Sequence, residues 1–461
     1  MTPSPAAPAT RPGMPQKIGF AALAFFVFSM FSSVVDLLPG INSIRPSLLD
    51  SVVGLLIVVG SGRMVEMLRS SLYRTYILLT LWFGVCVPFS VWPGGAAATI
   101  TGFWLVTFLA MFLAGGLIWN VDQCRKLVNV IGYSATILSV IALYFNKLDD
   151  EGRLMLPNTH YGNSNELALI GLVSLPFLTF MTMRVGNGLR RILGAVGFAP
   201  ILLMIAKTGS RAAMIGSGVA LIAVFFNVRA AQKAKLLVFS VVAVAALLVV
   251  LPSSITGRFF TVFSDSEAAS ASVDRTAAIE SAQARRMLLL DSITLSFTHP
   301  IFGVGPGNFA VAQDTLARAR GEEIGNWHLT HNTYTQFSSE SGFPGLLLFL
   351  TALVFSFRSI SRTMKMPFPP DNLEAQDLKG VALALRISMI GFLSCAFFDS
   401  LAYSPSLTVM LGFSASIEYV ARRLAAQVVI PVATSRGPQM IRPVPKRPMQ
   451  PMIGRQLPGR A

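Results

Sequence analysis

Long apolar runs recur along most of this 461-residue chain and constrain its fold more than any other feature. A helix of about 20 apolar residues is long enough to cross the roughly 30 Å of hydrocarbon in a bilayer. Hydrophobic residues make up 53% of the positions, above the usual share in soluble proteins. The sequence therefore predicts an all-α fold, a polytopic transmembrane bundle of about twelve helices. The runs lie near residues 18–38, 47–61, 72–92, 96–118, 127–145, 164–183, 189–206, 212–227, 235–252, 336–357, 380–400 and 404–421.

The net charge of +15 is explained by membrane topology. If the N-terminus lies inside, every inner loop carries a basic cluster, as the positive-inside rule requires. The basic balance therefore requires no nucleic-acid partner. Cys86, Cys124 and Cys395 lie in or beside apolar runs without metal-ligand spacing, so we predict packing roles for them rather than a disulfide or a zinc site.

The runs divide the chain into five segments. Residues 1–17, rich in Pro and Ala, form a disordered cytoplasmic N-terminus, and 18–252 hold the first nine spans, of which the first is uncleaved. Residues 253–335 form a large outer loop, in which apolar residues at three- and four-residue spacing predict a helix over 276–297. The last three spans occupy 336–422. The basic, Pro-rich tail 423–461 is predicted to be disordered, and its charge suits anionic lipid.

Several arginines on the outer side are candidate ligands for an anion. Arg211 lies in a very short outer turn beside an apolar run, where it needs an anionic partner or reaches the lipid headgroups. Arg285 and Arg286 lie at the polar edge of the loop helix and suit either a lipid surface or a substrate. Arg153 and Arg258 lie on the same side. Guanidinium groups are well shaped to bind a diphosphate in a two-pronged manner.

Two of the four histidines directly precede the span at 336–357. His331 and Tyr334 have helical spacing and are expected on one face, with Glu340 on another. A histidine at the water boundary can accept a proton at neutral pH. His331 is therefore a candidate base or, alternatively, a structural cap, and His328 is the alternative base.

One acidic cluster, Asp149-Asp150-Glu151, is rich enough in oxygen to suggest a divalent metal. It lacks further acids at regular spacing, so a solvated loop face is the simpler interpretation. We predict no metal site.

Four stretches in a fixed order resemble the signature of the O-antigen ligase and polymerase superfamily. The first two are Asn163-x-Asn165-Glu166-Leu167-Ala168 and Thr208-Gly209-Ser210-Arg211-Ala212-Ala213. The third is Arg285 upstream of His299-Pro300-Ile301-Phe302-Gly303-Val304-Gly305-Pro306-Gly307-Asn308-Phe309. The fourth is His331-Asn332-x-Tyr334, followed by Glu340-x-Gly342 and an apolar span. The resemblance covers about residues 150–360.

This resemblance implies a multi-pass glycosyltransferase of the bacterial inner membrane with a GT-C-like fold and an active site facing the periplasm. Its donor would be a glycan on undecaprenyl diphosphate. Ligases of the superfamily pass the glycan to lipid A core, polymerases to another lipid-linked repeat unit, and relatives to protein. Ligase and polymerase activity are not separable from this chain alone.

The resemblance also assigns roles to residues. Arg211, with Arg285 or its neighbour Arg286, would hold the leaving diphosphate without a metal or another cofactor. His331 would deprotonate the acceptor hydroxyl, and direct displacement would invert the anomeric carbon. The supporting residues would be His328, Asn332, Tyr334, Glu340, Arg153 and Arg258.

A polysaccharide or lipid-glycan transporter is the rival from another class. A transporter needs polar groups at mid-membrane depth, whereas nearly all the candidates here lie at the outer ends of spans, apart from Arg386 and Glu418 near inner ends.

Overall fold

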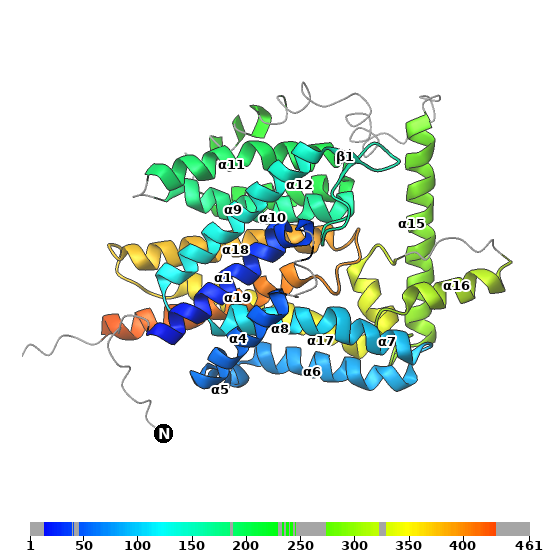
Figure 1. Ribbon diagram of the computed structural model, residues 1–461, viewed down its shortest axis with the longest axis horizontal. Coiled ribbons are helices and arrows are strands. Elements are labelled where there is room, and N and C mark those ends of the chain that lie inside the picture. Colours follow the sequence, from blue (N-terminus) through cyan, green and yellow to red (C-terminus); the bar gives the residue numbers. More distant parts are fainter. Residues whose placement is uncertain are drawn as a thin grey trace, which may run out of the picture.

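The computed structural model describes residues 13–38, 40, 46–184, 188–228, parts of 233–245, 273–321 and 329–429. Among these residues, helices form almost all of the regular structure, and the strands make one antiparallel hairpin. The hairpin pairs β1 (Lys147–Leu148) with β2 (Leu154–Met155). Long helices run side by side in one direction, while α15 stands across one end of them (Figure 1). The all-α polytopic prediction is confirmed.

Seven helices of the described chain are long and apolar enough to cross a membrane. Four are continuous: α1 (Met14–Ser32), α9 (Val121–Phe145), α10 (Ser164–Met183) and α18 (Leu373–Cys395). The other three are α6 (Ser71–Cys86) with the 3₁₀ turn η1 (Val87–Phe89), α7 (Pro93–Thr99) with the π-helical turn η2 (Ile100–Trp104) and α8 (Leu105–Gly116), and α17 (Thr333–Lys365). An eighth span is possible if α4 (Pro46–Gly60) and α5 (Arg63–Arg69), which meet at an 82° bend, are taken as one.

Three further predicted runs are also helical. They are α11 (Gly188–Lys207), the shorter apolar helix α12 (Arg211–Asn227) and α19 (Pro405–Val429). The predicted run at 235–252 lies largely outside the described residues. A helix therefore occupies every other predicted run, although fewer than twelve helices in the described chain are long and apolar enough to count as spans.

Several predicted boundaries were wrong. Helix α1 begins at Met14, inside the segment expected to be disordered, and ends at Ser32, because Ser33 takes a left-handed conformation (φ 50°) before the short helix α2 (Val34–Leu37). Helix α18 ends at Cys395, so residues 396–400 form a loop and not the end of a span. Helix α19 continues to Val429, into the predicted tail, and residues 430–461 lie outside the described part.

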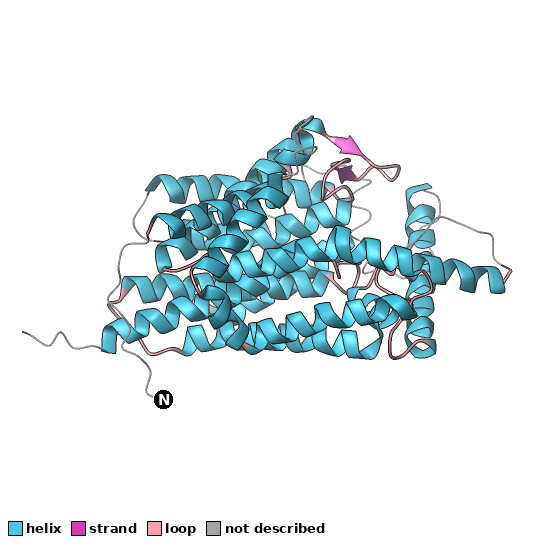
Figure 2. Cartoon of the chain, turned by 60° about the horizontal axis from the view of Figure 1, so that its bottom comes forward, coloured by secondary structure: helices cyan, strands magenta, loops and turns pink. Residues whose placement is uncertain are grey.

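The helices pack so that α18 lies at the centre, in contact with α9, α10, α12, α17 and α19. Aromatic side chains fill the core between the first and last spans, among them Tyr76, Phe83, Trp104, Phe337 and Phe413. We call the right-hand end of the bundle in Figure 1 the site end. There α9 and α18 end, α10, α12, α17 and α19 begin, and the hairpin lies beside α15 (Figures 1 and 2). The other end is called the opposite end.

Helix α17 is broken near its start, which the sequence analysis did not predict. Gly342 has φ 69° and ψ 178°, so the helix ladder is interrupted there. The carbonyl groups of Ser339 and Glu340 accept hydrogen bonds from the N–H groups of Val304 (2.7 Å) and Gly305 (3.0 Å). The break therefore supplies backbone acceptors to the glycine-rich loop at 303–307.

The glycines of this loop are required by both conformation and space. They are Gly303, Gly305 and Gly307. All three have positive φ, between 66° and 101°, which side chains with a Cβ rarely adopt. An added Cβ would also collide with Glu340, Ser90 or Thr99 respectively. The loop at 303–307 thus packs between the start of α17 on one side and η1 and α7 on the other.

Candidate active site

Helix α15 (Val273–Thr298) covers the site end and confirms the helix predicted over 276–297. Its buried face packs through Leu288 and Leu295 against the glycine-rich loop and α16 (Phe309–Ala319). The hydroxyl groups of Ser296 and Ser338 lie 2.7 Å apart and join α15 to α17. The loop helix is therefore a fixed cover on the start of α17.

Three arginines from separate parts of the chain lie within electrostatic range of one another at this end. Arg285 on α15 is half-buried, and its pKa is lowered by burial and by the positive charges of Arg211 and Arg153. The negative charges of Asp399 and Glu151 partly oppose this effect. Guanidinium groups that lie within electrostatic range of one another are suited to a multiply charged anion.

The structure separates the two adjacent arginines of α15. Successive residues of an α-helix point about 100° apart, since a turn holds 3.6 residues. Arg285 is half-buried and within electrostatic range of the other two arginines, whereas Arg286 is exposed. Of the predicted pair, Arg285 is therefore the member that belongs to the cluster.

Arg211 is fixed by contacts between two of the motifs identified in the sequence. It is the first residue of α12, and Ser210 caps that helix by accepting a hydrogen bond from the Ala213 N–H (3.3 Å). The Ser210 hydroxyl donates to Asn165 Oδ1 (2.9 Å) at the start of α10. The 163–168 and 208–213 motifs therefore form one junction, and Arg211 projects from it.

The hairpin delivers Arg153 to the cluster. Asp149 accepts hydrogen bonds from the backbone N–H and the Nε–H of Arg153 (2.9 and 2.8 Å) and from the Ser164 hydroxyl (3.1 Å). Glu151 lies 3.2 Å from the same guanidinium group. Two carboxylates of the acidic cluster, Asp149 and Glu151, thus position Arg153, while Asp150 is exposed, as a solvated loop face predicts. The described residues contain no group of three or more His, Cys, Asp or Glu side chains suited to a metal.

His331 lies just before α17, not within it. It adopts a left-handed conformation (φ 50°), and its N–H donates to Ser400 Oγ (2.8 Å). Asn332 follows in an extended conformation and caps α17 by accepting hydrogen bonds from the N–H groups of Tyr334 and Thr335. The prediction that His331 and Tyr334 share one helical face was wrong, because the cap turns the chain between them.

The other residues predicted to support the site hold helices together. Tyr334 donates its hydroxyl hydrogen to the carbonyl of Leu393 (3.0 Å), near the end of α18. The buried Glu340 carboxyl group accepts hydrogen bonds from the Tyr403 hydroxyl and the Gly307 N–H. Tyr334 thus joins the start of α17 to the end of α18, and Glu340 joins α17 to the glycine-rich loop and to the segment between α18 and α19. His328 and Arg258 lie outside the described residues.

The sequence analysis missed Asp399 and Ser400, which connect the histidine to the arginines. Asp399 is almost fully buried, and burial raises its pKa to about 6, although the Ser400 N–H and the charge of Arg285 oppose the shift. Ser400 binds the His331 backbone. An aspartate directly after the apolar stretch 380–398 was a possible signal, but the predicted span extended over it.

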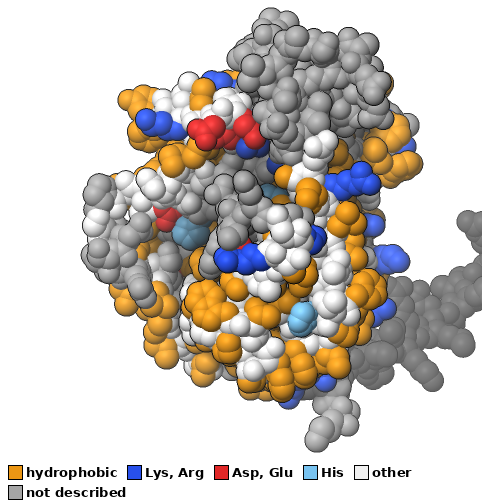
Figure 3. Space-filling model, turned by 90° about the vertical axis from the view of Figure 1, so that its right-hand side faces the viewer, with side chains coloured by type: hydrophobic (Ala, Val, Ile, Leu, Met, Phe, Trp, Pro, Cys, Tyr) orange, Lys and Arg blue, Asp and Glu red, His pale blue; other side chains and the backbone are white. Residues whose placement is uncertain are grey.

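The surface of the site end has a polar region. Basic side chains surface near the middle of this face, with acidic ones above and to their left, while hydrophobic side chains dominate its lower part (Figure 3). Charged groups at one end of a membrane-crossing bundle are typical of a site at the membrane boundary.

Part of the sequence matches a known protein family. Residues 195–350 match a family described as O-antigen ligase. This match supports membership of the O-antigen ligase superfamily. The matched region contains Arg211, Arg285 and His331. A search of curated proteins found no match.

The match supports a membrane protein of the O-antigen ligase and polymerase type, a family of glycosyltransferases. The candidate site has two chemical capacities. A cluster of guanidinium groups can bind and stabilise an anionic leaving group, and a nearby imidazole can move a proton.

Proposed function

We propose that this protein transfers a glycan from undecaprenyl diphosphate to an acceptor hydroxyl at the periplasmic face of the inner membrane. The observation that carries the proposal is the convergence of Arg285, Arg211 and Arg153, from α15, α12 and the hairpin. A lipid-linked donor presents its diphosphate at the membrane boundary, and these charges lie at one end of the apolar helices. An outer-face enzyme also lacks cytosolic sugar nucleotides, so its donor must arrive on a lipid.

In the proposed reaction, the acceptor oxygen attacks the anomeric carbon while the bond from that carbon to the diphosphate oxygen breaks. The bonding electrons leave with the diphosphate, and the guanidinium groups stabilise its negative charge. His331 accepts the proton of the acceptor hydroxyl. Attack from the side opposite the leaving group inverts the anomeric configuration.

Asp399 and Ser400 support this step without contacting the substrate. Ser400 fixes the His331 backbone, and the carboxylate of Asp399 acts electrostatically on Arg285. The arginines supply positive charge that a divalent metal provides in many diphosphate-using enzymes, so the mechanism needs no metal. A transporter would instead need such groups along its path at mid-membrane depth.

The acceptor is lipid A core in a ligase, a second lipid-linked glycan in a polymerase, or a protein. Supplying purified protein with labelled donor and each acceptor in turn, and identifying the labelled product, distinguishes them.

The exposure difference between Arg285 and Arg286 gives the decisive test. Arg285→Ala should weaken donor binding by about 10- to 100-fold, as expected when charge-assisted hydrogen bonds are lost. Arg286→Ala is the matched control and should change binding less than about twofold. The donor affinity of Arg285→Lys should lie between these two, because lysine keeps the positive charge but cannot make the planar, two-pronged contact of a guanidinium group. Donor affinity and transfer rate are measured in nanodiscs, and equal effects of Arg285→Ala and Arg286→Ala would refute the assignment.

A further inference from the structure

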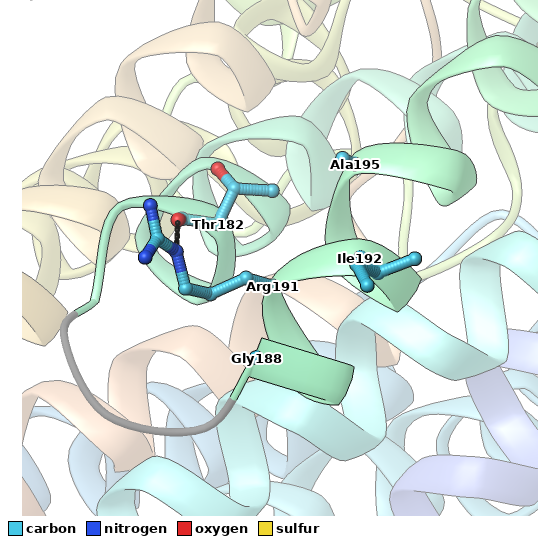
Figure 4. A pocket seen from close by; sticks show the side chains of 5 residues that line it. All are labelled: Thr182, Gly188, Arg191, Ile192 and Ala195. Atoms are coloured by element: carbon cyan, nitrogen blue, oxygen red, sulfur yellow. Dashed lines mark hydrogen bonds between the residues drawn. The ribbon is translucent and has the colours of Figure 1, made fainter.

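A shallow pocket lies at the opposite end, where α10 ends and α11 begins. It is lined by Thr182, Gly188, Arg191, Ile192 and Ala195 (Figure 4). The Nε–H of Arg191 donates to the carbonyl of Thr182 (3.2 Å), which holds the guanidinium group beside the end of α10. Arg191 is exposed, so the other edge of its planar fork faces outward.

The side of α11 beyond the pocket is suited to lipid. Ile192 is 60% exposed and Val196 63%, although both are large aliphatic side chains. On the inner side of the same helix, Gly194 packs closely against Thr182. Glycine thus faces the protein while aliphatic side chains face outward, so acyl chains can lie directly below the Arg191 guanidinium group.

The surroundings of the pocket carry a surplus of positive charge. Arg125 and Arg184 share one carboxylate, that of Asp377, at 2.8 and 2.9 Å. Two guanidinium groups on one acid leave one positive charge beside the pocket, and Arg191 adds another. An anionic group is therefore favoured here over a zwitterionic one.

We propose that this pocket binds the phosphate head group of an anionic glycerophospholipid, with an acyl chain along Ile192 and Val196. The phosphate oxygens lie on the outward edge of the Arg191 fork, a geometry that guanidinium groups favour. The inference rests on the chain crossing a membrane and not on glycan transfer, so either proposal can fail without the other.

Lipid binding by the full-length protein is the test. Purified protein in detergent is titrated with phosphatidylglycerol or with phosphatidylcholine of the same acyl chains, and bound lipids are counted by native mass spectrometry. We expect the wild type to bind phosphatidylglycerol about fivefold more tightly, as one cation near a lipid head group provides. Arg191→Gln should remove most of this preference, because only the net charge of Arg125, Arg184 and Asp377 then remains beside the pocket.

The matched control is Arg358→Gln. Arg358 is an exposed arginine on α17, near the opposite end, stacked over the Phe355 ring, so its substitution removes the same charge. It should leave the preference unchanged. A second pocket variant, Ile192→Glu, keeps Arg191 and its bond to Thr182 but introduces a negative charge at an exposed position, and it should abolish the preference.

Three results would overturn the proposal. They are equal binding of both lipids by the wild type, an unchanged preference in Arg191→Gln or Ile192→Glu, and an equal loss in Arg358→Gln. Inorganic phosphate at millimolar concentration should not displace bound phosphatidylglycerol. Displacement would identify a site for free phosphate and would also refute a lipid site.

Discussion

The two ends of the bundle use arginine in different ways. At the opposite end, single carboxylates lie between pairs of guanidinium groups. Asp377 binds Arg125 and Arg184, and Glu418 binds Arg422 (2.6 Å) and lies 3.4 Å from Arg362. These contacts connect α9, α10, α17, α18 and α19, and their geometry is that of clamps between helices.

At the site end, arginines are instead brought towards one another. The pKa of Arg285 is lowered by burial and by two like charges, and burial also disfavours the carboxylate form of Asp399, the neighbour of Ser400. Groups whose pKa values are shifted by burial and by nearby charges are common at functional sites. The comparison teaches that the arrangement of arginines, and not their number, distinguishes a binding site from a structural clamp.

The largest expected effect is that of the histidine. His331→Ala should lower the transfer rate by about 10²- to 10⁴-fold, the usual contribution of a positioned base, and leave donor affinity nearly unchanged. Single-turnover transfer and donor binding are measured separately. His299→Ala is the control, since His299 is an exposed histidine whose ring contacts the neighbouring Thr298. Near wild-type transfer by His331→Ala would remove the base from this mechanism.

Substitution of Asp377, the carboxylate shared by Arg125 and Arg184, should lower stability and leave activity unchanged. Asp377→Asn leaves two mostly buried guanidinium groups without their shared carboxylate and should destabilise the protein by about 3 kcal/mol. Transfer per folded molecule should not change. Thermal unfolding in detergent and activity after removal of aggregates test this pair of outcomes. A loss of specific activity with normal stability would place the opposite end in the reaction.

Asp399 gives a smaller effect that depends on pH. With its pKa near 6, Asp399 is mostly ionised at pH 7 and mostly neutral at pH 5. If the carboxylate supports Arg285 and the His331 loop, its titration should lower wild-type transfer about tenfold between these values. The pH profile of Asp399→Asn should lack this contribution and should lie near the low-pH level of the wild type. An unchanged profile and rate would exclude Asp399 from the site.

The same shift predicts a stability effect of defined sign. The pKa of Asp399 is raised in the folded state from 3.8 to about 6, so the folded protein binds this proton more tightly than the unfolded chain does. Its contribution to stability therefore falls as the pH rises from about 4 to 6. Asp399→Asn should accordingly unfold at a higher temperature than the wild type at pH 8, while being less active.

The smallest expected effect is that of metal removal. If the arginines alone stabilise the diphosphate, EDTA should change transfer by less than about twofold. Loss of activity on chelation, with recovery on addition of magnesium or manganese, would assign a metal role to Asp149, Asp150 and Glu151.

Local patterns were enough to predict much of this fold. Apolar runs identified the positions of the long apolar helices in the described chain, because crossing a bilayer requires about 20 consecutive apolar residues. The spacing of apolar residues before His299-Pro300 predicted α15 to within three residues at its start and one at its end. Motif order also indicated the arginines and the histidine that the family match covers.

Other features depended on contacts between distant segments. The break of α17 at Gly342 is stabilised by the loop at 303–307, and His331 is turned out of the helix because Asn332 caps it and Ser400 binds its backbone. The choice between Arg285 and Arg286 depends on how α15 is rotated against α17, and adjacent arginines carry no local signal of that rotation. Hydrophobic spacing determined where the helices form, whereas the tertiary structure decided which charged groups meet, because burial and electrostatic interaction depend on distance in space and not along the chain.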